Sequence, residues 1–237
     1  MPNVSDASLS RLVGRLVKRS VGPLIESLGF EWGRPREAWM AEGAATFFFQ
    51  WKRVSGQFAR FEQVPPSSIR AGFGVEYGSR VPLSAFRGRK PEMASYEQTS
   101  IRLFLSRTQR WTGEWTRSPD VWPVGSPVGA EAAVEDLARA ITSQGTEFIA
   151  RWSDPQWVFR ELESQVRGDL DGEIGVGAMM LPGMPNSYNR LHHLAKLADL
   201  LGDREAERLQ LERLLAKGEW PRYRARLDEL EGPAPSG

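Results

Sequence analysis

The sequence predicts an α+β protein: an antiparallel sheet of four or more strands packs against an N-terminal helix, and a C-terminal helical region ends in a helical hairpin. Apolar residues recur at three- and four-residue steps before residue 29 and again after residue 130, which is the spacing of one helix face. Between these segments they alternate with polar residues, as in half-buried strands. One-sided alternation favours antiparallel pairing, because parallel strands are usually buried on both faces.

The first segment is expected to be an amphipathic helix with a break. Its apolar stripe consists of Leu9, Leu12, Val13, Leu16, Val17, Val21, Leu24, Ile25 and Leu28. Ser5 or Asp6 can cap its start, and Gly29 suits the left-handed conformation that ends many helices. Pro23 lies inside the stripe, so we expect the helix to kink or split there.

Three segments have the alternation of strands: ATFFFQWKRV, SIRAGFGVEYG and SIRLFLSR. EAWMAE is expected to be a fourth strand that pairs through Gly43. The first helix should cover the face that carries Phe47, Phe49 and Trp51. Residues 79–97 and the segment TGEWTRSPDVWPVGSPVG are rich in turn residues and are expected to be loops.

Helical spacing returns in AEAAVEDLARAITSQGTEFIARW, and a further helix should start at Asp154 and Pro155. Beyond a Gly-rich connector, Gly202 should end the first helix of a hairpin and Asp203 should cap the second. Another helix should follow Pro221 and lead into a frayed tail. The expected organisation is an α+β core domain over 1–168, a connector over 169–186 and a helical hairpin with its tail over 187–237.

Composition narrows the functional classes. The chain has 31 basic and 30 acidic residues, so no overall field attracts it to nucleic acid or to a membrane. It has no cysteine, which removes disulfides, thiolate catalysis and thiolate metal sites. The N-terminal segment does not have the pattern of a signal peptide, and no later segment is apolar enough to span a bilayer. We therefore expect a cytoplasmic protein.

The two histidines, His192 and His193, are adjacent in the first helix of the predicted hairpin. On a helical wheel His193 projects almost opposite the apolar stripe, and His192 lies on its flank. Adjacent helical positions point in different directions, so the pair cannot ligate one ion as an i, i+4 pair does. We expect solvent-facing histidines and no metal site.

Other chemical motifs are incomplete. Asp169, Asp171 and Glu173 resemble the start of a calcium loop, but Ile174 and Met180 stand where the loop needs glycine and glutamate. The segment GEIGVGAMMLPG lacks the lysine and the preceding strand of a phosphate-binding loop. No nucleophile motif occurs in a suitable context. We expect no cofactor and no catalytic residues, with a two-carboxylate hydrolase as a lesser alternative for which no pair stands out.

The second face of the predicted sheet and the loop beside it carry the candidate binding residues. These are Phe48, Lys52, Arg70, Arg102, Phe104, Trp111 and Trp115. Aromatic side chains interleaved with Arg and Lys suit a protein-binding surface or a base-stacking platform. Layered packing favours the other interpretation, in which the tryptophan-rich loop or the later helices cover this face and Phe48 and Phe104 belong to the core.

The order of these elements resembles a bacterial family, domain of unknown function 4304. The resemblance is carried by Leu28–Phe30 at the helix end, FGVEYG at 73–78, IARWSDP, and the closing LAKLADLLGD. Two long loops, VPLSAFRGRKPEM and the tryptophan-rich segment, depart from the family pattern. The family implies an α+β fold and no established reaction, cofactor or catalytic residues. Similar small bacterial domains occur among antitoxin and immunity proteins, which is an analogy at the level of fold.

We therefore expect a non-catalytic protein that binds another protein, in an immunity-like role. Trp, Arg and Phe are abundant in the chain, and Trp and Arg dominate interface hot spots. The alternative is a binder of single-stranded nucleic acid or a nucleotide, using Phe48, Phe104, Arg102, Arg70 and Lys52. The net charge does not favour that alternative, and no membrane partner is expected.

Overall fold

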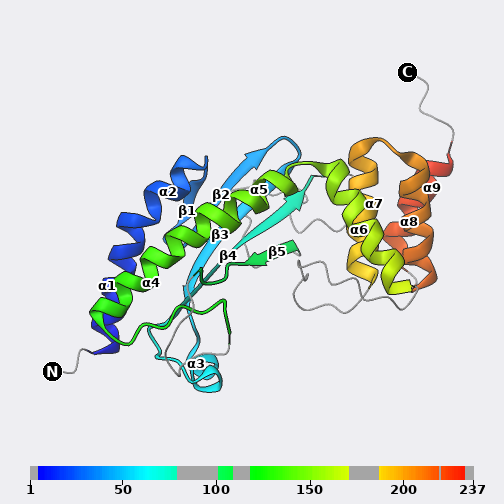
Figure 1. Cartoon of the computed structure of the whole chain (residues 1–237). Coiled ribbons are helices and arrows are strands. Elements are labelled where there is room, and N and C mark those ends of the chain that lie inside the picture. Colours follow the sequence, from blue (N-terminus) through cyan, green and yellow to red (C-terminus); the bar gives the residue numbers. More distant parts are fainter. Residues whose placement is uncertain (1–4, 79–100, 109–117, 171–186, 219, 233–237) are drawn as a thin grey trace. The chain divides into compact units, whose positions relative to one another are not determined.

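The computed structural model describes residues 5–78, 101–108, 118–170, 187–218 and 220–232. Its elements up to residue 104 are α1 (Asp6–Ser20), α2 (Gly22–Ser27), β1 (Glu31–Arg34), β2 (Glu37–Glu42), β3 (Ala45–Arg53), α3 (Gly56–Glu62), β4 (Ile69–Tyr77) and β5 (Ile101–Phe104). There follow α4 (Pro127–Ala140), η3 (Ile141–Gly145), α5 (Thr146–Trp152), α6 (Pro155–Leu170), α7 (Ser187–Leu201), α8 (Arg204–Ala216) and α9 (Pro221–Glu231). The predicted α+β class is confirmed (Figure 1).

The break in the N-terminal helix is where the sequence predicted it. The Ser5 side chain accepts a hydrogen bond from the backbone of Ser8 and so caps α1. A new helix, α2, starts at Gly22 with Pro23 in its first turn, where a missing backbone N–H costs nothing. Gly29, at φ 91°, ends this segment in the left-handed conformation that glycine adopts readily.

The five strands form one antiparallel sheet in the order β1-β2-β3-β4-β5. All four predicted strands are present, and Gly43, at φ 57°, lies in the turn between β2 and β3. The additional strand, β1, pairs with β2 so that Glu31 faces Trp39. Its burial pattern is mostly exposed, so it has no alternation that the sequence could reveal.

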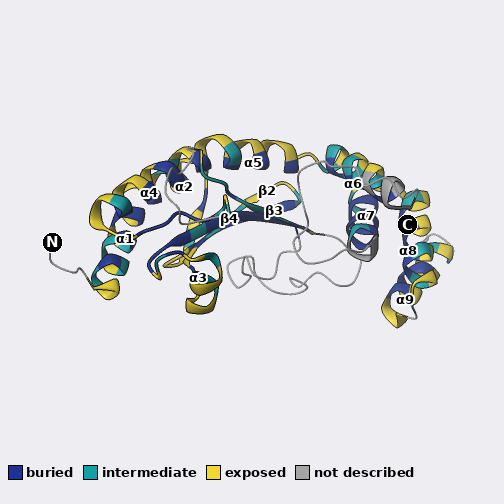
Figure 2. Ribbon diagram, turned by 60° about the horizontal axis from the view of Figure 1, so that its bottom comes forward, coloured by how far each residue is buried: buried dark blue, intermediate teal, exposed yellow. Residues whose placement is uncertain are grey.

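Helices α4 and α5 lie on one face of the sheet, and α3 lies on the other (Figure 2). Helix α1 packs alongside α4. Phe47 meets Phe148 of α5 edge to face, with ring centroids 6.2 Å apart. Phe49 packs on Phe73 at 5.2 Å. The predicted apolar face is therefore covered, and helices beyond the first contribute to the cover.

Between α4 and α5 the chain makes a π-helical turn, η3, that brings Gly145 against the sheet. A Cβ atom on Gly145 would lie 2.4 Å from Cε2 and 2.8 Å from Cζ of Phe73. No side chain fits at those distances without movement of the Phe73 ring. Glycine at this position therefore allows the helix to approach the strand closely.

The chain divides into two compact units. The first comprises residues 1–40, 47–74 and 103–149, and the second comprises 41–46, 75–102 and 150–237. The two units interleave along the chain. The loop expected over 79–97, residues 112–117 of the tryptophan-rich segment, most of the connector and the end of the tail lie outside the described residues. The rest of the tryptophan-rich segment is a loop up to Ser126, apart from a bridge between Trp122 and Ile69, and its last three residues begin α4.

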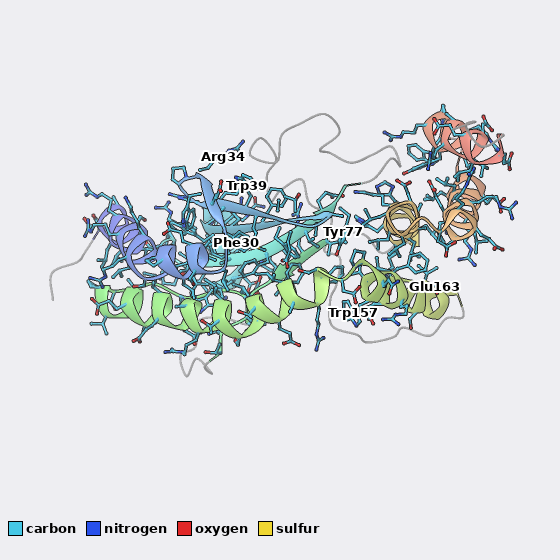
Figure 3. All side chains as sticks on the ribbon, turned by 90° about the horizontal axis from the view of Figure 1, so that it is seen from above. Phe30, Arg34, Trp39, Tyr77, Trp157 and Glu163 are labelled. Atoms are coloured by element: carbon cyan, nitrogen blue, oxygen red, sulfur yellow. The ribbon has the colours of Figure 1, made fainter. Side chains whose placement is uncertain are left out.

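In the second unit α7 packs against both α6 and α8, and α8 packs against α9. Gly202, at φ 72°, follows α7, and Asp203 caps α8 by accepting from the backbone of Ala206 at 3.0 Å. The predicted hairpin is confirmed. Tyr77, at the end of β4 (Figure 3), donates its hydroxyl to the carbonyl oxygen of Trp152 at 2.6 Å, and burial raises its pKa.

Candidate functional site

The structure separates the residues of the predicted binding face. Phe48 is 1% exposed and offers no surface to a partner, so its assignment to a binding face is corrected to a buried position. Trp111 and Trp115 lie outside the described residues. Lys52 is exposed, and Arg70, Arg102 and Phe104 are half-buried. Four of the seven residues thus keep some access to solvent.

Arg70 and Phe104 meet at one corner of the sheet. The Arg70 guanidinium carbon lies 4.9 Å from the ring centroid of Phe104 and 4.7 Å from that of Phe58 on α3. Asp120 forms an ion pair with the same guanidinium. A cation held over aromatic rings and paired with a carboxylate is fixed in one position. Arg70 therefore anchors α3 to the sheet.

Lys52 belongs to the same corner. The backbone N–H of Val54 donates to the carbonyl of Ser68 at 3.0 Å, which sets the antiparallel register and places Lys52 opposite Arg70. Helix α3 starts directly after β3, where the Ser55 side chain accepts from a backbone N–H of the first turn at 3.1 Å. The short loop thus carries α3 back over the end of the sheet.

Phe61 protrudes from this corner. It is 81% exposed, the highest value among the large apolar side chains of the described residues. It follows Phe58 by three residues, so the two rings are neighbours on one side of α3. Arg60 beside it is also exposed. We call the set Lys52, Phe58, Phe61, Arg70 and Phe104 the α3 corner.

Sequence reasoning missed α3 and with it Phe61. The helix has only seven residues, too few for a helical period to stand out. The available signal was the spacing of Ser55 and Phe58, which suits a helix cap followed by an apolar residue of the first turn. The pair Phe58 and Phe61, three residues apart, would have indicated one side of a short helix.

The placement of the histidines was wrong. His193 is 1% exposed and His192 is 8% exposed. One side of this helix was expected to face solvent, but every residue from Leu191 to Asp199 is buried because α7 packs against both α6 and α8. Nδ1 of His192 lies 3.1 Å from the hydroxyl of Tyr223. Burial lowers the pKa of His192 to about 4 and that of His193 to about 3, so both imidazoles are neutral at pH 7.

The same helix carries two buried charges. The ammonium of Lys196 forms an ion pair with Glu76 near the end of β4, and both side chains are at least nine-tenths buried. Burial lowers the pKa of Lys196, while the facing carboxylate favours its charged form. Asp199 lies 3.2 Å from the guanidinium of Arg226. Both contacts neutralise charges that would otherwise be buried alone.

Arg226 joins three helices of the second unit. Its guanidinium donates to Glu207 of α8 at 2.7 Å, as well as to Asp199 of α7. Hydrogen bonding to Glu207 raises its pKa. The side chains of Asp199 and Glu207 are 3% and 1% exposed. These contacts connect α7, α8 and α9 through buried side chains, so we interpret them as a structural network.

Among the described ranges, no three His, Cys, Asp or Glu side chains gather closely enough to hold a metal ion. None of the helices in those ranges combines the length and the apolar character needed to cross a bilayer. No family model, curated protein or solved structure matches the chain. The resemblance to family 4304 stays a prediction.

Proposed function

We propose that this protein acts by binding another protein, and that Phe61 at the α3 corner is the anchor of that interface. The observation that carries the proposal is the 81% exposure of Phe61. Burying such a ring in a partner's pocket contributes about 2 kcal/mol. Aromatic anchors flanked by arginine are typical of the residues that dominate interface energies. The immunity-like role expected above is one form of this binding.

The charges of the corner favour an acidic partner. Arg60, next to Phe61 in the chain, is exposed, whereas Arg70 is already paired with Asp120. The exposed charge beside Phe61 is therefore that of Arg60, since Glu62 on the other side is half-buried. A partner surface with an apolar pocket rimmed by Asp or Glu is complementary to it.

A nucleic-acid partner is less well supported. A base-stacking platform needs open aromatic faces, but Phe48 is buried and the Arg70 guanidinium lies over both Phe58 and Phe104. Only Phe61 of these rings protrudes. The corner therefore suits insertion into a pocket better than stacking along a strand.

The test compares capture from a lysate of the source organism by three immobilised full-length proteins: the wild type, Phe61→Ser and Val128→Ser. Val128, on α4, is 75% exposed and provides a matched loss of exposed apolar surface. We expect one stoichiometric acidic protein to be held by the wild type and by Val128→Ser, and to be held about tenfold more weakly by Phe61→Ser. Arg60→Glu should weaken the same capture.

The proposal is wrong if no stoichiometric protein is captured, or if Phe61→Ser captures it as well as the wild type does. Binding to random single-stranded oligonucleotides at low salt, measured by fluorescence anisotropy, covers the alternative. If Phe61→Ser abolishes oligonucleotide binding and nuclease treatment abolishes capture, the partner is nucleic acid. The expected cytoplasmic location is likewise a proposal, to be checked by cell fractionation.

A further inference from the structure

A cavity of about 790 Å³ opens in the first unit, where residues of α1 and α2 face residues of β1, the β1–β2 turn and β3. Its volume lies within the range of small-molecule sites. Val17, Pro23 and Pro35 give it apolar walls. No residue of the α3 corner lines it, so it is a second and separate candidate site.

Two tryptophans line the cavity. Trp32 is half-buried and is held edge-on by Phe49, with ring centroids 6.2 Å apart. Trp51 is 5% exposed, and its buried indole N–H donates no hydrogen bond to any of the described residues. A buried indole N–H normally finds an acceptor, and this one has none among the described residues.

Three cations line the same cavity: Lys18 of α1, Arg34 of the edge strand β1 (Figure 3) and Arg36 of the β1–β2 turn. Within the described part of the chain none of the three forms an ion pair. Arg36 lies over the Trp51 ring at 5.1 Å from its centroid. Among the described residues of the lining, Glu26 is the one acidic side chain, so these residues carry a positive excess.

We propose that this cavity binds a small aromatic anion, a molecule that joins a planar ring to a phosphate or carboxylate group. The ring packs beside Trp32, whose edge-on contact with Phe49 holds it in place. The anion pairs with Arg34 and Arg36, because a guanidinium can donate two parallel hydrogen bonds to either acid.

The test titrates the full-length protein with four compounds: phenyl phosphate, benzoate, phenol and inorganic phosphate. The readout is the NMR signal of each tryptophan indole N–H, with Trp32→Phe and Trp51→Phe used to identify the two cavity signals. We expect both aromatic anions to shift these signals. Phenol and inorganic phosphate should bind at least about tenfold more weakly, since phenol lacks the acidic group and inorganic phosphate lacks the aromatic ring. The tighter of the two aromatic anions identifies the acidic group.

Trp122 provides an internal control, because it does not line the cavity and its indole N–H already donates to Asp136 at 2.9 Å. Its signal should stay in place in every titration and in every folded variant. Arg34→Gln and Arg36→Gln should each raise the Kd of the preferred anion by about tenfold, the effect of losing one charged hydrogen bond. Arg19→Gln, an exposed position on α1 outside the lining, should leave Kd unchanged.

The proposal is overturned if neither aromatic anion shifts the signals of Trp32 and Trp51 at millimolar concentration. It is also overturned if inorganic phosphate binds as tightly as phenyl phosphate, because the rings would then contribute nothing. Equal Kd values for Arg34→Gln, Arg36→Gln and Arg19→Gln would remove the guanidinium groups from the site.

Discussion

At the scale of single residues, Gly145 illustrates how tightly η3 is set against the sheet. We expect Gly145→Ala to destabilise the protein by about 1–3 kcal/mol, because its Cβ would overlap the Phe73 ring. Gly14→Ala, in α1 with open space around its Cβ, should instead be neutral or stabilising by up to about 1 kcal/mol. Urea unfolding of both variants measures the contrast.

A second substitution checks the cause. In the Gly145→Ala background, Phe73→Leu should cost less than it does in the wild type, because the smaller side chain removes the overlap. The two changes are in direct contact, so their free energies should not add. Strictly additive values would show that the cost of the alanine arises somewhere other than at Phe73.

The sequence predicted in which strand a residue lies and to which face it points, but it did not predict how exposed the residue is. Phe47, Phe48 and Phe49 were correctly assigned to one strand with alternating directions, since alternation follows from the pleat. What alternation does not contain is whether the second face is covered. Phe48, at 1% exposed, and Phe61, at 81%, are both phenylalanines, and only the packing distinguishes them.

At the scale of elements, the contacts of Arg226 hold three helices together. We expect Arg226→Met to lower the free energy of unfolding by about 2–4 kcal/mol, because it leaves the carboxylates of Asp199 and Glu207 buried without a cation. Arg208→Met is the matched control: it removes an exposed ion pair with Glu212 on the same helical layer and should change stability by less than about 0.5 kcal/mol. Urea denaturation followed by circular dichroism compares the two.

If Arg226→Met and Arg208→Met lowered the free energy of unfolding equally, the Arg226 contacts would contribute no more than an exposed ion pair does. Restoring the charge without the planar fork, as in Arg226→Lys, should recover only part of the stability. An ammonium cannot donate to Asp199 and Glu207 in the two-pronged geometry that the guanidinium provides.

Element boundaries marked by Gly, Pro and capping residues were predicted well, and elements without such signals were not. The split at Pro23 and the hairpin at Gly202 follow from backbone chemistry that is local to the sequence. Strand β1 and helix α3 are short, with four and seven residues, so tertiary packing decides their conformation. The predicted exposure of the histidines was wrong for a related reason. Helix α7 has neighbours on more than one side, and the sequence of α7 alone does not indicate this.

At the scale of the whole molecule, the buried histidines should make stability depend on pH. Burial lowers their pKa values to about 4 and about 3, while a histidine in the unfolded chain titrates near 6.5. As the pH falls below about 6.5 the unfolded chain therefore binds protons that the folded chain does not, and stability decreases. We expect a loss of about 1–2 kcal/mol per histidine between about pH 7 and pH 5.

The measurement is the urea midpoint across this range for the wild type and for a His192→Leu, His193→Leu double variant. The variant should lose little stability between pH 7 and pH 5, whatever its absolute stability, since carboxylates of the unfolded chain titrate mainly at lower pH. A variant that loses as much as the wild type would assign the acid sensitivity to other groups.

The fold class was predictable because alternation and helical period are properties of long segments. The sheet contains several segments with alternation, and the C-terminal hairpin contains segments with helical period. A unit that takes in residues 41–46, 75–102 and everything from 150 depends on pairings between distant segments. The candidate site follows the same rule, since the α3 corner joins residues that are up to 52 positions apart in the chain.

The Lys196–Glu76 pair has a consequence for truncated forms of this protein. A fragment that starts at residue 187 would look self-sufficient on paper, with its helices and turns intact. It would nevertheless lack Glu76, the ion-pair partner of the buried Lys196, which lies 120 residues upstream. Such a truncation should expose that amine to water and loosen the fragment, and extending it to include Glu76 should be what restores order.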